Sequence, residues 1–226
     1  MVSENASQVI ESSPFLQKHS AMIRIWHWMT FLVLTGSIIT VLINATMLDP
    51  RENMAMVQNQ LKGRGAEVTE QQAFAVSHEY EDKMWEIHKL LGYGLAILLV
   101  SRLIIEFAQP QEEKIRSRIK KAMRMFKLNG SNKVEYRHYL YVKRLYLLFY
   151  LILALMALTG LGLALGRDLG FTRETHQLIK TVHGLCQYFM YTFVIVHLGG
   201  VILAENSKDK GIVSGMIHGN KELEYI

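Results

Sequence analysis

Histidine is the side chain in this sequence with the clearest capacity for chemistry, and nine histidines are present. Four of them fall inside long apolar stretches, where an ionisable side chain is costly and is a functional candidate by default. The other five (19, 78, 138, 176, 218) lie in tails, loops or the starts of helices, where a solvated imidazole needs no explanation. The candidate site residues are therefore His27, His88, His183 and His197.

The spacing of the last two histidines is the most informative. His183 and His197 are separated by 14 positions in an otherwise apolar segment. On an α-helix, this spacing places them within about 40° of one face and about 21 Å apart along the axis. A single helix would therefore offer an imidazole near each of its ends.

Four apolar blocks carry these histidines, at residues 23–47, 85–107, 139–165 and 182–204. Each reaches the roughly 20 residues that a helix needs to cross a hydrocarbon core of about 30 Å. The sequence predicts an all-α integral membrane protein in which a four-helix bundle occupies 23–204. An amino-terminal segment, 1–22, precedes this domain, and a carboxy-terminal tail, 205–226, follows it. The short link between the last two blocks favours an antiparallel pair of helices.

Basic residues predict the orientation of the bundle. Residues 108–144 contain 11 Lys and Arg against 3 acidic residues, whereas the loop at 47–84 contains 4 basic and 7 acidic residues. The positive-inside rule then places 108–144 and both termini in the cytoplasm. The net charge of +5 is thus explained by topology, and nucleic-acid binding is not expected. Within 108–144, Ile115, Ile119, Met123 and Phe126 recur at near-helical spacing, which indicates either a basic amphipathic helix on the inner leaflet or a solvated connector.

Alternation of the spans pairs the histidines by depth. His27 and His197 fall near the inner surface, and His88 and His183 near the outer surface. Two imidazoles that face each other across a bundle match six-coordinate haem iron better than tetrahedral zinc, which needs four converging ligands. A proton relay normally includes Asp or Glu as well, and the spans carry acids only at their ends. The remaining alternative is that each histidine only hydrogen-bonds a neighbouring helix.

The single cysteine, Cys186, narrows the cofactor chemistry further. Thiolate-bound iron–sulfur clusters, four-thiolate zinc sites and covalent c-type haem attachment each need at least two sulfurs. Imidazole ligation of non-covalent haem remains.

Other residues of the spans could support a bound haem. Arg24 and Arg102 are candidates to pair with haem propionates, although both are also placed to reach lipid headgroups. The aromatic residues Trp26, Trp28, Trp85 and Tyr93 are expected at the membrane interfaces. Small residues in the spans would allow close approach of a backbone or a flat macrocycle: Gly36, Gly92, Gly94, Gly160, Gly162 and Gly184.

Several segments together resemble the b-type cytochrome subunit of membrane-bound nickel–iron hydrogenases. They are R-I-W-H-W at 24–28 with Thr35-Gly36, the segment IHKLLGYGLAILLVSR that ends at Arg102, Thr159-Gly160, the His183/His197 spacing, and the tail ENSKDKGIVSGMIHGNKE. That family belongs to a clan of four-helix di-haem cytochromes b, which includes membrane subunits of formate dehydrogenases and thiosulfate reductases.

The resemblance implies two haem b groups in the bacterial inner membrane, with His88 and His183 as axial ligands of the outer haem and His27 and His197 of the inner one. It also implies that electrons come from a periplasmic iron–sulfur subunit and reach a quinone, menaquinone or ubiquinone, near the inner haem. The alternatives are a stand-alone quinone-linked cytochrome, a subunit of a formate dehydrogenase or thiosulfate reductase type complex, and a haem-free membrane anchor.

Overall fold

The computed structural model describes residues 20–128, 133–206 and 211–219, and the regular secondary structure in these ranges is helical. The helices are α2 (Ala21–Thr46), α3 (Pro50–Lys62), α4 (Glu70–Ala108), α5 (Ile115–Leu128), α6 (Lys133–Leu165), α7 (Arg173–Glu205) and α8 (Ile212–His218). Four of them, α2, α4, α6 and α7, are long and apolar enough to cross a membrane. The predicted all-α fold with four spanning helices is confirmed.

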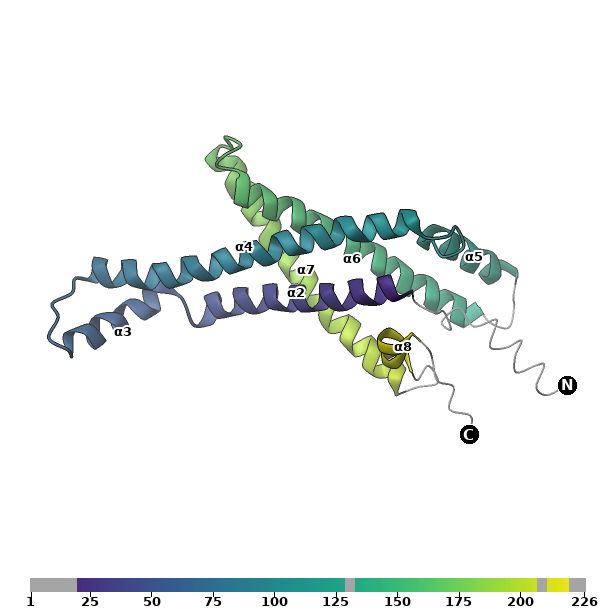
Figure 1. Cartoon of the computed structure of the whole chain (residues 1–226), viewed down its shortest axis with the longest axis horizontal. Coiled ribbons are helices and arrows are strands. Elements are labelled where there is room, and N and C mark those ends of the chain that lie inside the picture. The colour runs from purple at the N-terminus through teal and green to yellow at the C-terminus, as the bar shows by residue number, and fades with distance from the viewer. Residues whose placement is uncertain (1–19, 129–132, 207–210, 220–226) are drawn as a thin grey trace.

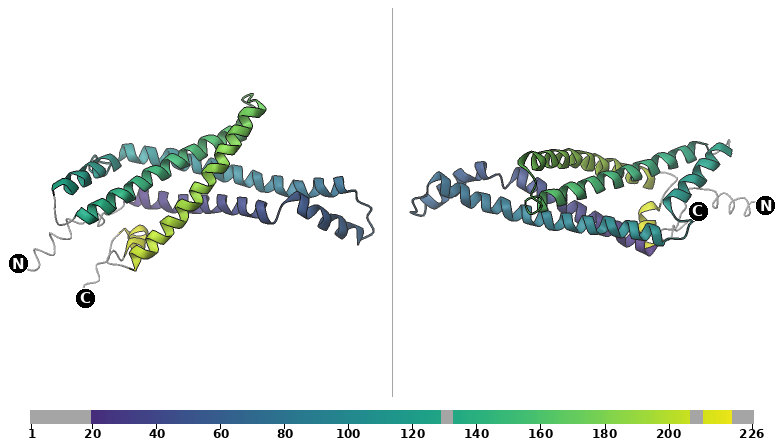
Figure 2. Two further views of the ribbon diagram at one scale, coloured as in Figure 1. Left: turned by 180° about the vertical axis from the view of Figure 1, so that it is seen from behind. Right: turned by 90° about the horizontal axis from the view of Figure 1, so that it is seen from above.

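Two antiparallel pairs make up the bundle. Helix α2 packs along α4, α6 packs along α7, and contacts between α4 and α6 join the pairs. The two pairs cross each other (Figures 1 and 2). The start of α2, helix α5 and helix α8 lie at one end of the bundle, which we call the α5 end. Helix α3 and the start of α4 extend beyond the opposite end, which we call the α3 end.

The segment between the first two apolar blocks differs from the expected loop. It forms α3 and the first turns of α4, which pack against each other as a helical hairpin. A capping box begins α4 at Glu70, because the Thr69 hydroxyl accepts from the Gln72 amide and the Gln72 side chain accepts from the Thr69 amide. The capped helix runs without interruption from the polar residues at its start into the apolar block that follows.

Helix α5 forms where the sequence predicts a basic amphipathic helix, but its apolar side has a protein partner. Ala122 is buried together with Tyr136 and Tyr139, from the start of α6, and Met125 and Phe126 pack against this cluster. The aromatic residues that extend α6 beyond its apolar block supply this surface. Helix α5 is therefore a helix packed on α6 rather than a solvated connector.

The core of the bundle is small and lies midway along its length. Phe149 and Leu153 of α6 and Met190 of α7 are buried there, with Leu34, Leu99 and Phe193 packed around them. Only 11% to 22% of the most apolar stretch of each long helix is buried inside the chain. The apolar side chains therefore mostly face outward, as in helices surrounded by lipid tails.

Candidate functional site

His27 and His197 lie against each other at the α5 end of the bundle. Their ring centroids are 6.2 Å apart and their planes differ by 63°. Helices α2 and α7 are not close packing partners along their length, so the two imidazoles meet across a gap between backbones. Two imidazoles that each bind one metal atom at about 2.0 Å would have ring centres about 6 Å apart, so the observed separation fits a single iron between them.

His88 and His183 project from α4 and α7 toward the α3 end, and they are close enough to interact electrostatically. Each ring is held through its Nδ1 atom by a hydroxyl of another helix. Thr40 Oγ1 of α2 lies 2.9 Å from His88 Nδ1, and Thr159 Oγ1 of α6 lies 2.9 Å from His183 Nδ1. All four helices of the bundle therefore contribute to this level.

The buried core separates the two pairs of histidines. Met190 lies midway between His183 and His197 on α7, and it packs against Phe149 and Leu153. Phe193 stacks on the His197 ring at 5.8 Å with an interplanar angle of 6°, and also on Phe149 at 4.4 Å. Apolar and aromatic side chains thus fill the bundle between the two levels.

The glycines of the spans fall into two groups. A Cβ atom on Gly36 or Gly94 would meet Leu91 or Val33 at 3.4 Å, so these two allow α2 and α4 to pack closely. By contrast, a Cβ atom on Gly92 or Gly184 would meet nothing within 4 Å. Gly92 lies one turn from His88 on the same face of α4, where open space next to a candidate ligand fits a flat macrocycle.

The two candidate arginines have different surroundings. Arg24, one turn before His27, has buried Nε and Nη1 atoms without a hydrogen-bond partner among the described residues. Arg102 is buried, donates to Glu106 at 3.1 Å and to Tyr150 at 3.2 Å, and lies over the Trp26 ring. Arg24 is therefore free to meet an anionic group such as a propionate, whereas most of Arg102 is already engaged within the protein.

Trp26 corrects the expectation that the tryptophans form an interfacial belt. Its side chain is 8% exposed and its indole donates to the Leu98 carbonyl at 2.7 Å. Trp28 and Trp85 are more exposed, and their indoles donate to Met216 and to Glu81. The two tryptophans of the R-I-W-H-W motif are only two positions apart but have different partners, because the rotation of the helix turns Trp26 toward α4 and Trp28 toward α8.

The sequence argument did not identify Thr40 and Thr159 as partners of the histidines. For Thr40 a signal was present, because the buried face of α2 consists of Trp26 and four polar residues at helical spacing (Thr30, Ser37, Thr40, Asn44). A polar stripe along an apolar helix indicates a face turned toward protein rather than lipid. For Thr159 the only signal was the Thr159-Gly160 pair itself.

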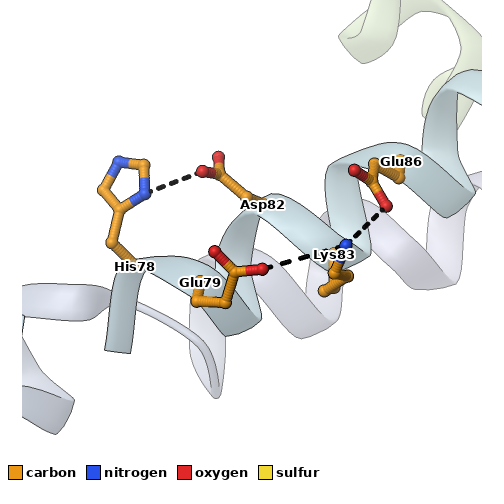
Figure 3. A network of polar contacts seen from close by, with 5 residues as sticks. All are labelled: His78, Glu79, Asp82, Lys83 and Glu86. Atoms are coloured by element: carbon orange, nitrogen blue, oxygen red, sulfur yellow. Dashed lines mark hydrogen bonds and ion pairs between the residues drawn. The ribbon is translucent and has the colours of Figure 1, made fainter. Parts of the chain in front are cut away.

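His78 lies apart from these two levels, on the surface of α4. It is 3.0 Å from Asp82, in a network that also contains Glu79, Lys83 and Glu86 (Figure 3). Across the described ranges, no group of three or more His, Cys, Asp or Glu side chains is placed to hold a metal ion. The donor set is therefore imidazole alone, two rings at each level, which fits haem iron with both axial positions filled.

Comparison with known proteins agrees with this donor set. The family model of prokaryotic cytochrome b561 matches residues 18–219, which include the four long helices and all four histidines. No curated protein and no solved structure matches the chain. Since the family match extends over most of its length, the chain belongs to the prokaryotic cytochrome b561 family, membrane proteins that bind haem b and transfer electrons.

Proposed function

We propose that this cytochrome holds two haem b groups, one between His27 and His197 and one between His88 and His183, and carries electrons from one membrane surface to the other. The observation that carries the proposal is the 6.2 Å separation of the His27 and His197 rings, which come from helices that are not close packing partners. The rings of His88 and His183, each hydrogen-bonded to a threonine hydroxyl, support a second haem site at the α3 end.

A haem with imidazole on both axial positions supplies one-electron transfer and has no open coordination position for oxygen. The chain's own residues set the conditions for this chemistry. The paired helices keep the imidazoles in place, and the core around Phe149, Leu153 and Met190 excludes water between the two levels. Arg24 offers a guanidinium near the His27 level, where it would neutralise a propionate.

The α5 end is proposed to face the cytoplasm. This end carries basic residues of 108–144, and the start of α2 and helix α8 also lie there (Figure 1). Short loops rich in Lys and Arg remain on the cytoplasmic side of the inner membrane. The haem between His27 and His197 would then be the inner one, and the haem between His88 and His183 the outer one.

A quinone, menaquinone or ubiquinone, is proposed to accept the electrons at the α5 end. Reduction of one quinone to the quinol takes two electrons, delivered singly, and two protons from the adjacent aqueous phase. A groove of about 270 Å³ supports this location, because it opens between α2 and α8 on the turn that carries His27. Trp28, Met29 and Met216 line it, so it offers apolar surface for a quinone ring.

The electron donor is proposed to be a periplasmic iron–sulfur subunit, as in nickel–iron hydrogenases, that docks at the α3 end. The hairpin of α3 and the start of α4 extends beyond the bundle there and supports a docked subunit over a stand-alone cytochrome (Figure 1). Purification of the complex in mild detergent tests this point. An iron–sulfur protein in the purified complex supports docking, and a cytochrome that purifies alone with full quinone reduction contradicts it.

Haem content tests the core of the proposal. The purified protein is expected to contain two haems b per chain, with the sharp reduced bands of low-spin bis-imidazole iron. Alanine at any one of the four histidines should remove one haem, whereas His78→Ala, at the ion-paired surface position, should remove none. A haem-free protein, or four alanine variants that all keep two haems, would show that these histidines serve only helix packing.

A further inference from the structure

Hydroxyl groups approach the two histidines at the α3 end in the same way. Thr40 Oγ1 and Thr159 Oγ1 each lie 2.9 Å from the Nδ1 atom of a histidine on a neighbouring helix, His88 and His183 respectively. Ser37 Oγ is a second, longer contact of His88 Nδ1, at 3.4 Å. The arrangement comes from both helix pairs, so it is not the repeat of one local motif.

The position of the hydroxyl protons decides which ring nitrogen carries hydrogen. Thr40 donates its proton to the Ser37 carbonyl at 2.6 Å, and Thr159 donates to the Leu155 carbonyl at 2.6 Å. With its single proton engaged in this way, each hydroxyl oxygen is left as an acceptor, which assigns the ring proton of His88 and of His183 to Nδ1. The unprotonated Nε2 atom of each ring is left to bind iron.

The histidines at the α5 end have a different environment. In the residues that the structure describes, no hydroxyl or carbonyl is hydrogen-bonded to the rings of His27 or His197. Instead, His197 stacks on Phe193, and His27 meets the edge of Trp28 at 5.6 Å. The two levels of the bundle would therefore offer a bound iron imidazoles of unequal donor strength.

We propose that Thr40 and Thr159 are positioning residues that hold the midpoint potential of the haem at the α3 end below that of the haem at the α5 end. An imidazole whose Nδ1 proton is held by an acceptor is a stronger donor through Nε2. A stronger donor stabilises the oxidised iron and lowers its potential. The inference rests on the proposed function and deepens it, because a lower potential at the α3 end would favour electron movement from that end to the α5 end.

Gly160 contributes to the same arrangement on α6. A Cβ atom at this position would lie 3.3 Å from His183 Cε1, which is tighter than an ordinary contact. The glycine therefore lets the His183 ring lie against the backbone of α6. Thr159, the preceding residue, accepts a hydrogen bond from Nδ1 of that ring. Thr159 and Gly160 together position the His183 ring, one by a hydrogen bond and the other by leaving space.

Redox titration of the purified holoprotein tests the proposal. Valine has the shape of threonine without the hydroxyl, so we use Thr159→Val and the double variant Ser37→Ala/Thr40→Val, which removes both hydroxyls near His88. Each is expected to keep two haems and to move only the lower midpoint potential in the positive direction. A tenfold change in the reduction equilibrium constant, about 59 mV for one electron, sets the scale.

Three variants separate this effect from general changes in the helices. Thr159→Ser keeps a hydroxyl and should restore the original potential. Thr30→Val removes a buried hydroxyl of α2 that has no hydrogen-bond partner among the described residues, and should move neither potential. Thr181 lies two residues before His183 and donates to the Gln177 carbonyl of its own helix. Thr181→Val removes this bond and should also move neither potential.

A second measurement needs no threonine variant and covers the case in which valine expels the haem. His27→Ala should keep only the haem at the α3 end, and its potential should match the lower of the two in the wild-type protein. The proposal is wrong if that haem has the higher potential, or if the valine variants keep two haems with both potentials unchanged. Neither result affects haem binding by the four histidines, which is tested separately by their alanine variants.

Discussion

The imidazoles of His27 and His197 face each other at 6.2 Å, although they come from opposite ends of the chain and from helices that are not close packing partners. The approach is therefore made by the side chains themselves rather than by contact along the helices. If both imidazoles bind one haem, loss of His27, loss of His197 and loss of both should each remove that haem.

Paired substitutions test this equivalence. His27→Ala and His197→Ala should each remove the same haem, because we expect this site to need both imidazoles, and the double variant should lose no more than either single variant. By contrast, His27→Ala combined with His88→Ala should leave no haem. Haem per chain, measured as the pyridine haemochromogen, gives the count, and loss of two haems from the His27/His197 double variant would disprove this pairing.

Leu153 should be one of the most sensitive packing positions. Its side chain is 1% exposed between the two histidine levels, so Leu153→Ala would leave a cavity and cost about 2–5 kcal/mol. Leu158, on the same helix but 69% exposed, offers a matched control, since its truncation should have little effect. Thermal unfolding in detergent measures both. Equal melting temperatures for the two variants would contradict a core at this level.

The Arg102 and Glu106 pair should stabilise the corner between α4 and α5. Glu106 accepts from Arg102 at 3.1 Å and from the Ile115 amide at 2.7 Å, so it links the end of one helix to the start of the next. Arg102→Ala leaves a partly buried carboxylate without its cation, at a cost of about 3 kcal/mol.

An exposed ion pair provides the comparison for Arg102. Lys83 bonds Glu79 and Glu86 on the surface of α4, with its side chain 62% exposed (Figure 3). Lys83→Ala should leave the melting temperature unchanged, because such pairs are well solvated. The double variant Arg102→Leu/Glu106→Leu should recover part of the loss seen in Arg102→Ala. No recovery would place the effect in the contacts of Arg102 with Trp26 and Tyr150 instead.

Glu205 should control the order of α8. Its carboxylate accepts from the amides of Gly211 and Val213, at the start of this short helix. Glu205→Ala removes both bonds, so we expect faster hydrogen exchange at 212–218, corresponding to about 1 kcal/mol of local stability. Glu205→Gln keeps an oxygen acceptor and should exchange more slowly than the alanine variant. Identical exchange in wild type and Glu205→Ala would contradict a capping role.

The proposed orientation can be tested by thiol labelling. Cys186, the single cysteine, is 4% exposed, so background labelling should be low. Met56 of α3 and Met123 of α5 are exposed at opposite ends of the bundle, which makes Met56→Cys and Met123→Cys a matched pair. A membrane-impermeant reagent should label Met56→Cys from the periplasmic side and Met123→Cys only after the membrane is opened. The reverse pattern would invert the topology.

The sequence by itself determined the number of spanning helices and the levels of the four histidines. Apolar blocks of membrane length are local features, and alternation of direction then assigns each histidine to one end. The spacing of Ile115, Ile119, Met123 and Phe126 indicated a helix as one of two alternatives for the basic segment, and the structure forms α5 there. These properties depend on segment length and helical period, which a linear sequence contains directly.

Only the tertiary structure decided which side chains meet between helices. The bonds from Thr40 to His88 and from Thr159 to His183, the burial of Trp26 and the partnership of Arg102 with Tyr150 each join residues from different helices. Such contacts depend on how far each helix is rotated about its axis and where the two pairs cross. A rotation of one residue is about 100°, so a small difference in packing exchanges one set of partners for another.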